Sequence, residues 1–220
     1  MKKKNFLNFS NIWDIENIFY LKSDISRIFK IICHYEIFRL TKNVPGEIIE
    51  CGVFKGNSFV RFLSFRNLIK IKNKKAFGFD VFGNFPKQKI KEDNIFAQNH
   101  DKLIGKGYPI NIIKNSLDKK KIKNFKLIKG NIIKTLPIFL KKKKELQISF
   151  LHLDLDVYEP TKFVLQNLYS KVSKNGVILI DDYGQVKGAT KATNEFLKKN
   201  KRFKIKTLGF NKRLKFIVKS

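Results

Sequence analysis

The fold of this chain is decided by two stretches, LHLDLDVY at residues 151–158 and GVILIDDY at residues 176–183. Both are runs of apolar residues that end in carboxylates, and such runs are typical of strands buried on both faces of a parallel sheet. Residues 161–172, between them, have the spacing of an amphipathic helix, and its crossover should be right-handed. The two strands therefore run in the same direction and bring Asp154, Asp181 and Asp182 to one edge of the sheet.

Ligands of open α/β sheets bind at that carboxyl edge. Carboxylates this close together cannot all stay ionised unless a cation lies among them. A single strand-end aspartate is more often a helix cap or the partner of a lysine, and this chain is rich in lysine. Three converging aspartates instead favour a site for a positively charged ligand.

The formal net charge of +29 suggests an anionic partner, either a nucleic acid or a membrane surface. However, only six of the 47 basic residues are arginine, the side chain that phosphate-reading surfaces prefer. Lys, Ile, Asn and Phe are all abundant, which a compositional bias of the genome explains equally well. Two cysteines make no disulfide framework, and we find no signal peptide or membrane span, so we expect a cytoplasmic protein. Peripheral contact of Lys-rich, Phe-studded segments with a membrane surface stays open.

The chain is long enough for one domain with a full core. We expect an N-terminal helical extension at residues 1–45, in which Ser23 caps a helix that reaches Leu40 and packs an apolar face on the main domain. The main domain should span residues 46–220. Within it, residues 83–124 are polar and Lys-rich, and we interpret them as a lid or substrate insertion that carries His100 and Asp101.

Strand and helix patterns alternate through the main domain and end in a hairpin. We expect a seven-stranded, mostly parallel, doubly wound α/β sheet with a C-terminal antiparallel hairpin. The expected strands are 47–54, 75–82, 125–132, 147–156, 176–183, 203–210 and 214–219. The expected helices are 59–68, 135–144 with Pro137 in its first turn, 161–172 and 187–199.

The first strand leads into a glycine-containing turn, ECGVFKGNS at residues 50–58. Gly52 and Gly56 permit a tight turn and the close approach of a ligand, and the helix that follows offers free N–H groups to an anion. The spacing is not that of a dinucleotide fingerprint. Asp80 ends the second strand, where a carboxylate suits a ribose diol, although a solvated loop aspartate is the simpler alternative. His152 lies deeper in the fourth strand, and we interpret it as a packed, hydrogen-bonded histidine.

Six segments carry a resemblance to a known family: GEIIECGVFKGNSF, FDVFGNFP, KGNIIKTLP, LHLDLDVYEPT, ILIDDYG and GATKATNEF. Over residues 45–200 the chain resembles the macrocin O-methyltransferases, which are class I S-adenosylmethionine-dependent sugar O-methyltransferases with a Rossmann-like fold. The resemblance implies that the methionine part of S-adenosylmethionine is surrounded by Glu50, Gly52, Phe54, Gly56 and Ser58. It implies further that Asp80 holds the ribose and that Asn131 lies by the adenine.

The same resemblance implies that Asp154, Asp181 and Asp182 bind a divalent metal, Mg²⁺, with Asp156 and Tyr158 at the same edge. This layout of carboxylates is similar to that of catechol-type O-methyltransferases. Their lysine base has no counterpart here, because Asp154 is followed by Leu155, Asp156 and Val157. We therefore expect Asp154 to receive the proton, with His100 or Asp101 on the lid as rivals.

The predicted function is metal-assisted, in-line methyl transfer to a sugar or polyol hydroxyl of a small-molecule or glycan acceptor with vicinal hydroxyls. A hard cation takes both oxygens of a diol and lowers the pKa of one hydroxyl. One alternative is an RNA methyltransferase, although Asp154-Leu-Asp-Val stands where adenine-N6 enzymes carry an Asn/Asp-Pro-Pro-aromatic tetrad, so we expect no nucleic-acid partner. A second alternative is a non-catalytic anion-binding or membrane-surface module. The apolar N-terminal helix could serve a homo-oligomer.

Overall fold

A computed structural model describes residues 11–220 and places seven strands in one sheet, in the order β3-β2-β1-β4-β5-β7-β6. The five strands β1 to β5 are mutually parallel, and β7 runs antiparallel to both β5 and β6. The predicted fold is thereby confirmed. The strands are β1 Glu47–Cys51, β2 Ala76–Asp80, β3 Phe125–Lys129, β4 Ile148–Leu153, β5 Val172–Ile180, β6 Lys206–Leu208 and β7 Asn211–Val218.

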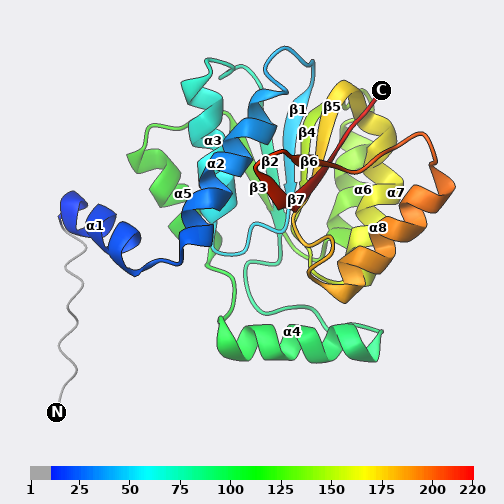
Figure 1. The fold of residues 1–220 in the computed structure, drawn as a ribbon, viewed down its shortest axis with the longest axis horizontal. Coiled ribbons are helices and arrows are strands. Elements are labelled where there is room, and N and C mark those ends of the chain that lie inside the picture. The colour runs from blue at the N-terminus through cyan, green and yellow to red at the C-terminus, as the bar shows by residue number, and fades with distance from the viewer. Residues whose placement is uncertain (1–10) are drawn as a thin grey trace.

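Helices cover both faces of the sheet (Figure 1). One face carries α2 (Ile25–Arg39), α3 (Asn57–Leu68) and α5 (Ile110–Lys119). The other carries α6 (Ile132–Lys142), α7 (Tyr158–Leu168), a 3₁₀ turn at Tyr169–Lys171 and α8 (Lys187–Lys199). None of the helices in residues 11–220 combines the length and apolar composition that a membrane crossing needs.

Alternate residues of each central strand face opposite helical layers, which is why the strands are apolar throughout. In β4, Phe150 packs with the α2–α3–α5 layer, whereas Leu151 and Leu153 pack with α6, α7 and α8. In β1, Ile48 and Ile49 divide in the same way. Burying both faces fixes the register of the strands and therefore the position of the residues that follow them.

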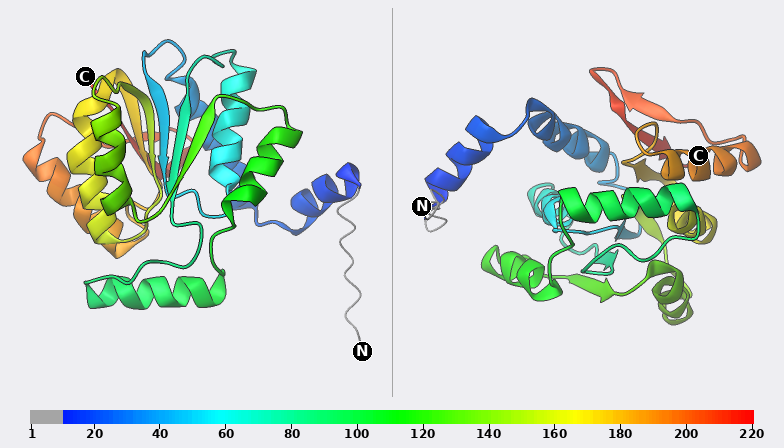
Figure 2. Two further views of the ribbon diagram at one scale, coloured as in Figure 1. Left: turned by 180° about the vertical axis from the view of Figure 1, so that it is seen from behind. Right: turned by 90° about the horizontal axis from the view of Figure 1, so that it is seen from below.

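The N-terminal region contains two helices instead of the single predicted one. The cap of α2 is Asp24, whose carboxylate accepts a hydrogen bond of 2.9 Å from the backbone N–H of Ser26, and Ser23 instead ends α1 (Ile12–Lys22). The predicted apolar face of α2 packs on the sheet through Cys33, Ile37 and Phe38. By contrast, α1 buries no residue and extends away from the sheet (Figures 1 and 2). Residues 1–10 of the expected extension lie outside the described part.

Residues 83–124 contain two helices that the sequence analysis did not predict. Helix α4 (Lys91–Leu103) lies across the carboxyl edge of the sheet (Figure 2). Helix α5 is the crossover between β2 and β3, and it buries Ile113 and Leu117 in the core. Only the first part of the stretch therefore has the position of a lid.

Helix α6 begins earlier than predicted. The side chain of Asn131 accepts a hydrogen bond of 2.9 Å from the backbone N–H of Ile133 and starts the helix at Ile132. The predicted position of Pro137 in the first turn is therefore wrong, because it lies in the second turn.

Candidate active site

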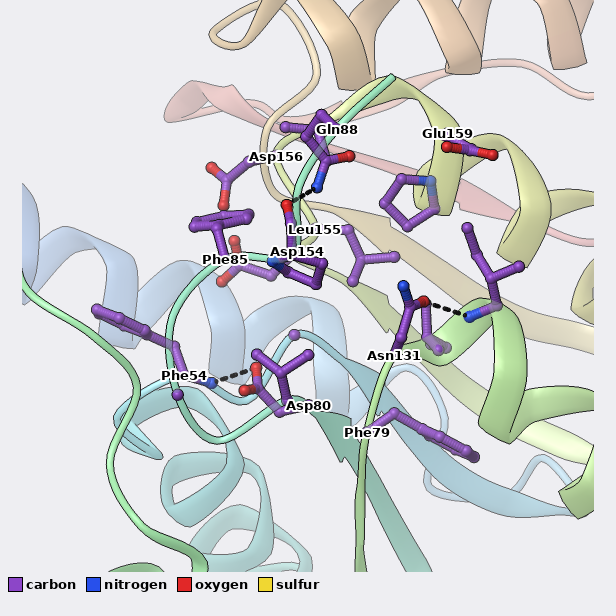
Figure 3. Close-up of a pocket in the computed structure, with 18 of the residues that line it drawn as sticks. Phe54, Phe79, Asp80, Phe85, Gln88, Asn131, Asp154, Leu155, Asp156 and Glu159 are labelled. Atoms are coloured by element: carbon purple, nitrogen blue, oxygen red, sulfur yellow. Dashed lines mark hydrogen bonds between the residues drawn. The ribbon is translucent and has the colours of Figure 1, made fainter. Parts of the chain in front are cut away.

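A cavity opens at the carboxyl edge of the sheet, between the strand ends and the segment that leads into α4 (Figure 3). It is bounded by the β1–α3 turn, the ends of β2 and β3 and the β4–α7 turn. Seven residues that the sequence analysis placed at this edge line the cavity: Gly52, Phe54, Asp80, His100, Asn131, Asp154 and Asp156. The fold therefore brings residues from five separate parts of the chain to one cavity.

The ends of β1 and β4 touch at Gly52. This glycine has a φ of +95°, and a Cβ there would lie 1.7 Å from the backbone oxygen of Asp154. Any larger residue would push the β1–α3 turn away from the acidic end of β4. Gly52 thus permits direct contact between the β1–α3 turn and the end of β4.

Asp80 organises the β1–α3 turn. One carboxylate oxygen accepts hydrogen bonds from the backbone N–H groups of Val53 (3.0 Å) and Phe54 (2.9 Å), and the other accepts one from Phe82 (2.6 Å). Burial raises the pKa of Asp80 against these hydrogen bonds. The side chain faces the cavity, beside Phe54 (Figure 3). It holds the loop on which a cofactor would rest, a role that the sequence analysis did not assign to it.

Glu50 and Ser58 lie beneath this loop and do not line the cavity. The Ser58 hydroxyl donates to the Glu50 carboxylate, and both side chains are buried. Gly56, the N-cap of α3, has a φ of +89° and lines a neighbouring groove. Of the five residues expected around the methionine part of the cofactor, Gly52 and Phe54 face the cavity, while Glu50, Gly56 and Ser58 support the turn from behind.

The predicted metal ligands separate into two groups. Oxygen atoms of Asp154, Asp156 and Asp182 all lie within 4.8 Å of one another. The fourth carboxylate, Asp181, is not part of this group and belongs to a second cluster with His34 and His152. The structure therefore gathers Asp156, and not Asp181, with the other two acids.

Burial is the largest influence on the pKa values of the first group, Asp154, Asp156 and Asp182. Together with repulsion from neighbouring carboxylates, it raises the pKa of Asp154 and of Asp182 well above the ordinary value. The same two causes raise the pKa of Asp156 to about 8. The Asp182 carboxylate accepts a hydrogen bond of 2.9 Å from the backbone N–H of Asp156, which holds the β4–α7 and β5–α8 turns together. These three acids repel one another and would be relieved by a cation.

Asp181 is surrounded by cationic and imidazole groups. Lys30 of α2 donates a hydrogen bond to one carboxylate oxygen, and the ring nitrogens of His34 and His152 lie 3.5 and 3.9 Å from the other. Burial opposes ionisation, but the neighbouring His152 and His34 rings and the charge of Lys30 hold the pKa of Asp181 well below its usual range. Asp181 is thus the ionised member of the acidic edge.

His152 is buried, as predicted, and packs against Phe62 and Phe150. Its ring nitrogens lie 3.4 Å from a Glu50 oxygen and 3.9 Å from an Asp181 oxygen, and neither nitrogen makes a hydrogen bond, so the predicted hydrogen bonding of His152 is wrong. Burial works against protonation, yet the two carboxylates raise the pKa of His152 to about 10. Burial lowers the pKa of His34 to about 3, so His34 is neutral.

Lys30 and His34 are residues of the candidate site that the sequence analysis did not name. They lie four residues apart on α2, on the face that also carries Phe38, so they point at the sheet with the apolar residues. A lysine and a histidine on an otherwise apolar helical face are the signal that could have identified them.

The lid contributes His100, which lines the cavity. Its ring lies 5.1 Å from both Phe54 and Phe85 and 6.1 Å from Phe96, and burial lowers its pKa. Asp101 accepts hydrogen bonds from the Asn84 side chain (3.1 Å) and the Phe85 N–H (3.0 Å), so it shapes the loop. Tyr158 turns away from the cavity, and its hydroxyl donates to Glu195 of α8 at 2.7 Å.

Comparison with known proteins identifies this architecture. The family model of macrocin O-methyltransferase (TylF) matches residues 33–207, which is most of the chain. The chain belongs to the macrocin O-methyltransferase family. The match includes both acidic strand ends, the glycine turn and the part of α2 that carries His34.

The following relatives of this macrocin O-methyltransferase family member have low sequence identity to it. The demethyldecarbamoylnovobiocin O-methyltransferase of Streptomyces niveus is 24% identical over 158 residues, covering 70% of this chain and 59% of the relative. This chain therefore spans about three fifths of that relative's length. The calicheamicin methyltransferase CalS11 superposes with a TM-score of 0.77 at 20% identity, over 95% of this chain and 86% of its own. The O-methyltransferase NovP gives 0.75 at 20% identity, over 87% and 79%. These likenesses establish the shared methyltransferase fold.

Proposed function

We propose that this protein transfers a methyl group from S-adenosylmethionine to a hydroxyl of a sugar or polyol, with the help of a divalent metal, Mg²⁺. The observation that carries the proposal is the cluster of three mutually repelling carboxylates, Asp154, Asp156 and Asp182. Asp154 and Asp156 lie in the wall of the cavity that Gly52 and Asp80 also form. Membership of the macrocin O-methyltransferase family supports the reaction class. CalS11, described as a TDP-rhamnose 3'-O-methyltransferase, supports a sugar acceptor.

The residues of the acidic edge fit a hard cation. All the donor atoms of the Asp154 group are carboxylate oxygens, which Mg²⁺ prefers to nitrogen or sulfur. The raised pKa of each acid in the group also means that a cation would be needed to keep all three ionised. We propose that Asp154 and Asp182 hold the metal and that Asp181, which is already ionised, supplies further negative charge. When bound, such a metal would make a diol hydroxyl more acidic and orient it.

The other side chains of the cavity suit the binding of the cofactor. Asp80 has its carboxylate at the end of β2. Val53 and Phe54 occupy one of its oxygens, and the other, which accepts from Phe82, keeps a lone pair that can accept a hydrogen bond from a ribose hydroxyl. The Asn131 oxygen is used as the cap of α6, so its amide N–H groups are the part available to an adenine. Phe54, Phe85 and His100 enclose the cavity and would exclude water from the transfer step.

Two carboxylates are candidates for the proton acceptor. We retain Asp154, and Asp156 joins it because it lines the same cavity and belongs to the same acidic group. His100 is the neutral alternative on the lid. Each would take the hydroxyl proton as the methyl group moves from sulfur to oxygen.

The test is methyl transfer from labelled S-adenosylmethionine to a panel of sugars and sugar nucleotides. We expect transfer that stops with EDTA and returns with Mg²⁺, and an Asp154→Asn variant that is inactive although it still binds S-adenosylhomocysteine. Turnover that ignores EDTA, or a fully active Asp154→Asn variant, would remove the metal from the proposal. Labelling of RNA, and not of sugars, would favour the RNA methyltransferase alternative.

A further inference from the structure

A groove lies on the other side of the glycine turn from the cavity, between α1, α2, α3 and α5. Its floor is the N-terminus of α3, at Gly56 and Asn57, and its sides carry Arg27, Lys55 and Arg61. Phe19 and Tyr108 add aromatic surface. The groove therefore combines free backbone N–H groups, three cationic side chains and apolar walls.

The arginines are the informative feature of this groove. The chain has only six, so a random lysine-rich surface would rarely bring two together. In residues 11–220 no carboxylate lies within ion-pair distance of Arg27 or Arg61. Burial, followed by repulsion from Arg27, lowers the pKa of Arg61, while the more distant Glu50, Asp181 and Asp154 raise it. Two neighbouring arginines without a carboxylate at ion-pair distance form a site that a bound anion would stabilise.

Arg61 also connects the groove to the acidic edge. Its guanidinium lies 3.2 Å from Nδ1 of His34, and Nε2 of the same ring lies 3.5 Å from Asp181. One imidazole ring therefore separates the arginine from Asp181 at the acidic edge. Lys55 makes a second connection, because its ammonium donates a hydrogen bond of 2.6 Å to the carbonyl of Ile104, the residue that ends α4.

We infer that this groove binds the phosphate or diphosphate group of an acceptor sugar that is presented on a phosphate ester carrier. Arg27, Arg61 and the N-terminus of α3 would bind the phosphate oxygens, since bidentate guanidinium contacts and helix N-termini both suit phosphate. Phe19 and Tyr108 would contact the carrier, either a nucleoside or a lipid. The inference rests on the proposed function for the identity of the sugar, but the anion site itself can be tested separately.

The experiment is isothermal titration calorimetry of the full-length protein in the presence of EDTA, so that no metal can recruit the ligand to the acidic edge. The probes are inorganic pyrophosphate, uridine diphosphate and farnesyl diphosphate, with S-adenosylhomocysteine as a separate ligand. We expect Arg61→Gln and Arg27→Gln each to weaken binding of all three diphosphates at least tenfold. Arg202→Gln, which removes the same charge from an exposed arginine stacked on Phe203, should leave that binding unchanged.

The outcomes separate the two proposals. Arginine-dependent binding of the diphosphates supports the inference, and the tighter of the nucleoside and lipid probes identifies the carrier. No diphosphate binding, or equal losses in the Arg202→Gln control, overturns it even if S-adenosylhomocysteine binds. Losses of S-adenosylhomocysteine binding as large as those of pyrophosphate would also overturn it, because the groove would then serve the cofactor's carboxylate. A wild-type protein that binds no S-adenosylhomocysteine contradicts the proposed function and not the anion site.

Discussion

The Lys30 ammonium donates a hydrogen bond to the Asp181 carboxylate, although the two residues are 151 positions apart in the sequence. Lys30 belongs to the helix before β1, and Asp181 follows β5. Because α2 packs on the sheet, an N-terminal element contributes a cation to the acidic edge at which we place the reaction. This cation and a bound metal would repel each other.

Lys30→Met should tighten Mg²⁺ binding about tenfold, because it removes that repulsion. It should also destabilise the metal-free protein by about 1–3 kcal/mol, since Asp181 loses its charged partner at a largely buried position. Titration of the unfolding midpoint with Mg²⁺ measures both effects. The matched control is Lys162→Met, which breaks an ion pair with Glu195 at the half-exposed surface of α7 and α8. Weaker Mg²⁺ binding in Lys30→Met would mean that the lysine supports the site and does not compete with the metal.

Asp154→Asn should abolish methyl transfer, with a loss of at least about 100-fold, while it raises the stability of the metal-free protein by about 1–3 kcal/mol. The opposite signs follow from one cause, because burial and repulsion from its neighbours make Asp154 costly to bury unless a cation is bound. Urea unfolding in EDTA and a methyl-transfer assay give the two values. Asp118→Asn, at the surface of α5, serves as the control. Lower stability of Asp154→Asn in EDTA would contradict this reading of the acidic edge.

The stabilising effect of Mg²⁺ should grow between pH 6.5 and pH 8. In the folded, metal-free protein the pKa of Asp156 is raised to about 8 from 3.8, so its contribution to stability is complete below pH 3.8 and is lost as the pH rises through 8. Asp154 and Asp182 shift in the same direction. His34, with a pKa lowered to about 3, affects stability only below pH 6.5 and is outside this window.

Urea midpoints at the two pH values, with EDTA and with Mg²⁺, measure this dependence. Asp156→Asn should reduce the difference, because it removes one of the titrating acids. An equal effect of Mg²⁺ at both pH values would show that metal binding does not displace protons from the cluster.

Gly52→Ala should destabilise the protein by at least about 3 kcal/mol and prevent S-adenosylhomocysteine binding. Its Cβ would lie 1.7 Å from the backbone oxygen of Asp154, and φ is +95°, so both the turn and the end of β4 would have to move. Gly209→Ala has no atom within 4 Å of the added Cβ and should be close to neutral. A soluble Gly52→Ala variant with unchanged cofactor affinity would show that the two strand ends do not need this contact.

The sheet could be predicted from the sequence because burial on both faces leaves a strong signal. All seven strands lie within the predicted regions or within a few residues of them, and Lys187–Lys199 is helical as predicted. The crossover helix α5 was missed although Ile110, Ile113 and Leu117 have the i, i+3, i+7 spacing of one helical face. The helix has only 10 residues and lies in a polar, Lys-rich stretch, which favoured the interpretation of the whole stretch as a lid.

The composition of the acidic group could be predicted only in part. The strand ends fixed the neighbourhood of Asp154 and Asp182, but side-chain directions beyond a strand depend on the turn that follows. Asp156 has a φ of +60°, a left-handed conformation that brings it to the other two acids and that no residue pattern indicated. Asp181 belongs to the other cluster because α2 supplies Lys30 and His34, and that contact depends on the packing of an element far away in the sequence.

The most direct test of the central claim is a titration of Mg²⁺ into the complex with S-adenosylhomocysteine, followed by calorimetry, for the wild type, Asp182→Asn and Asp118→Asn. The account predicts one Mg²⁺ site in the wild type and in Asp118→Asn, and a loss of at least about tenfold in affinity in Asp182→Asn. Absence of Mg²⁺ binding in the wild type, or equal affinity in all three proteins, would contradict a metal site at the acidic edge of this sheet.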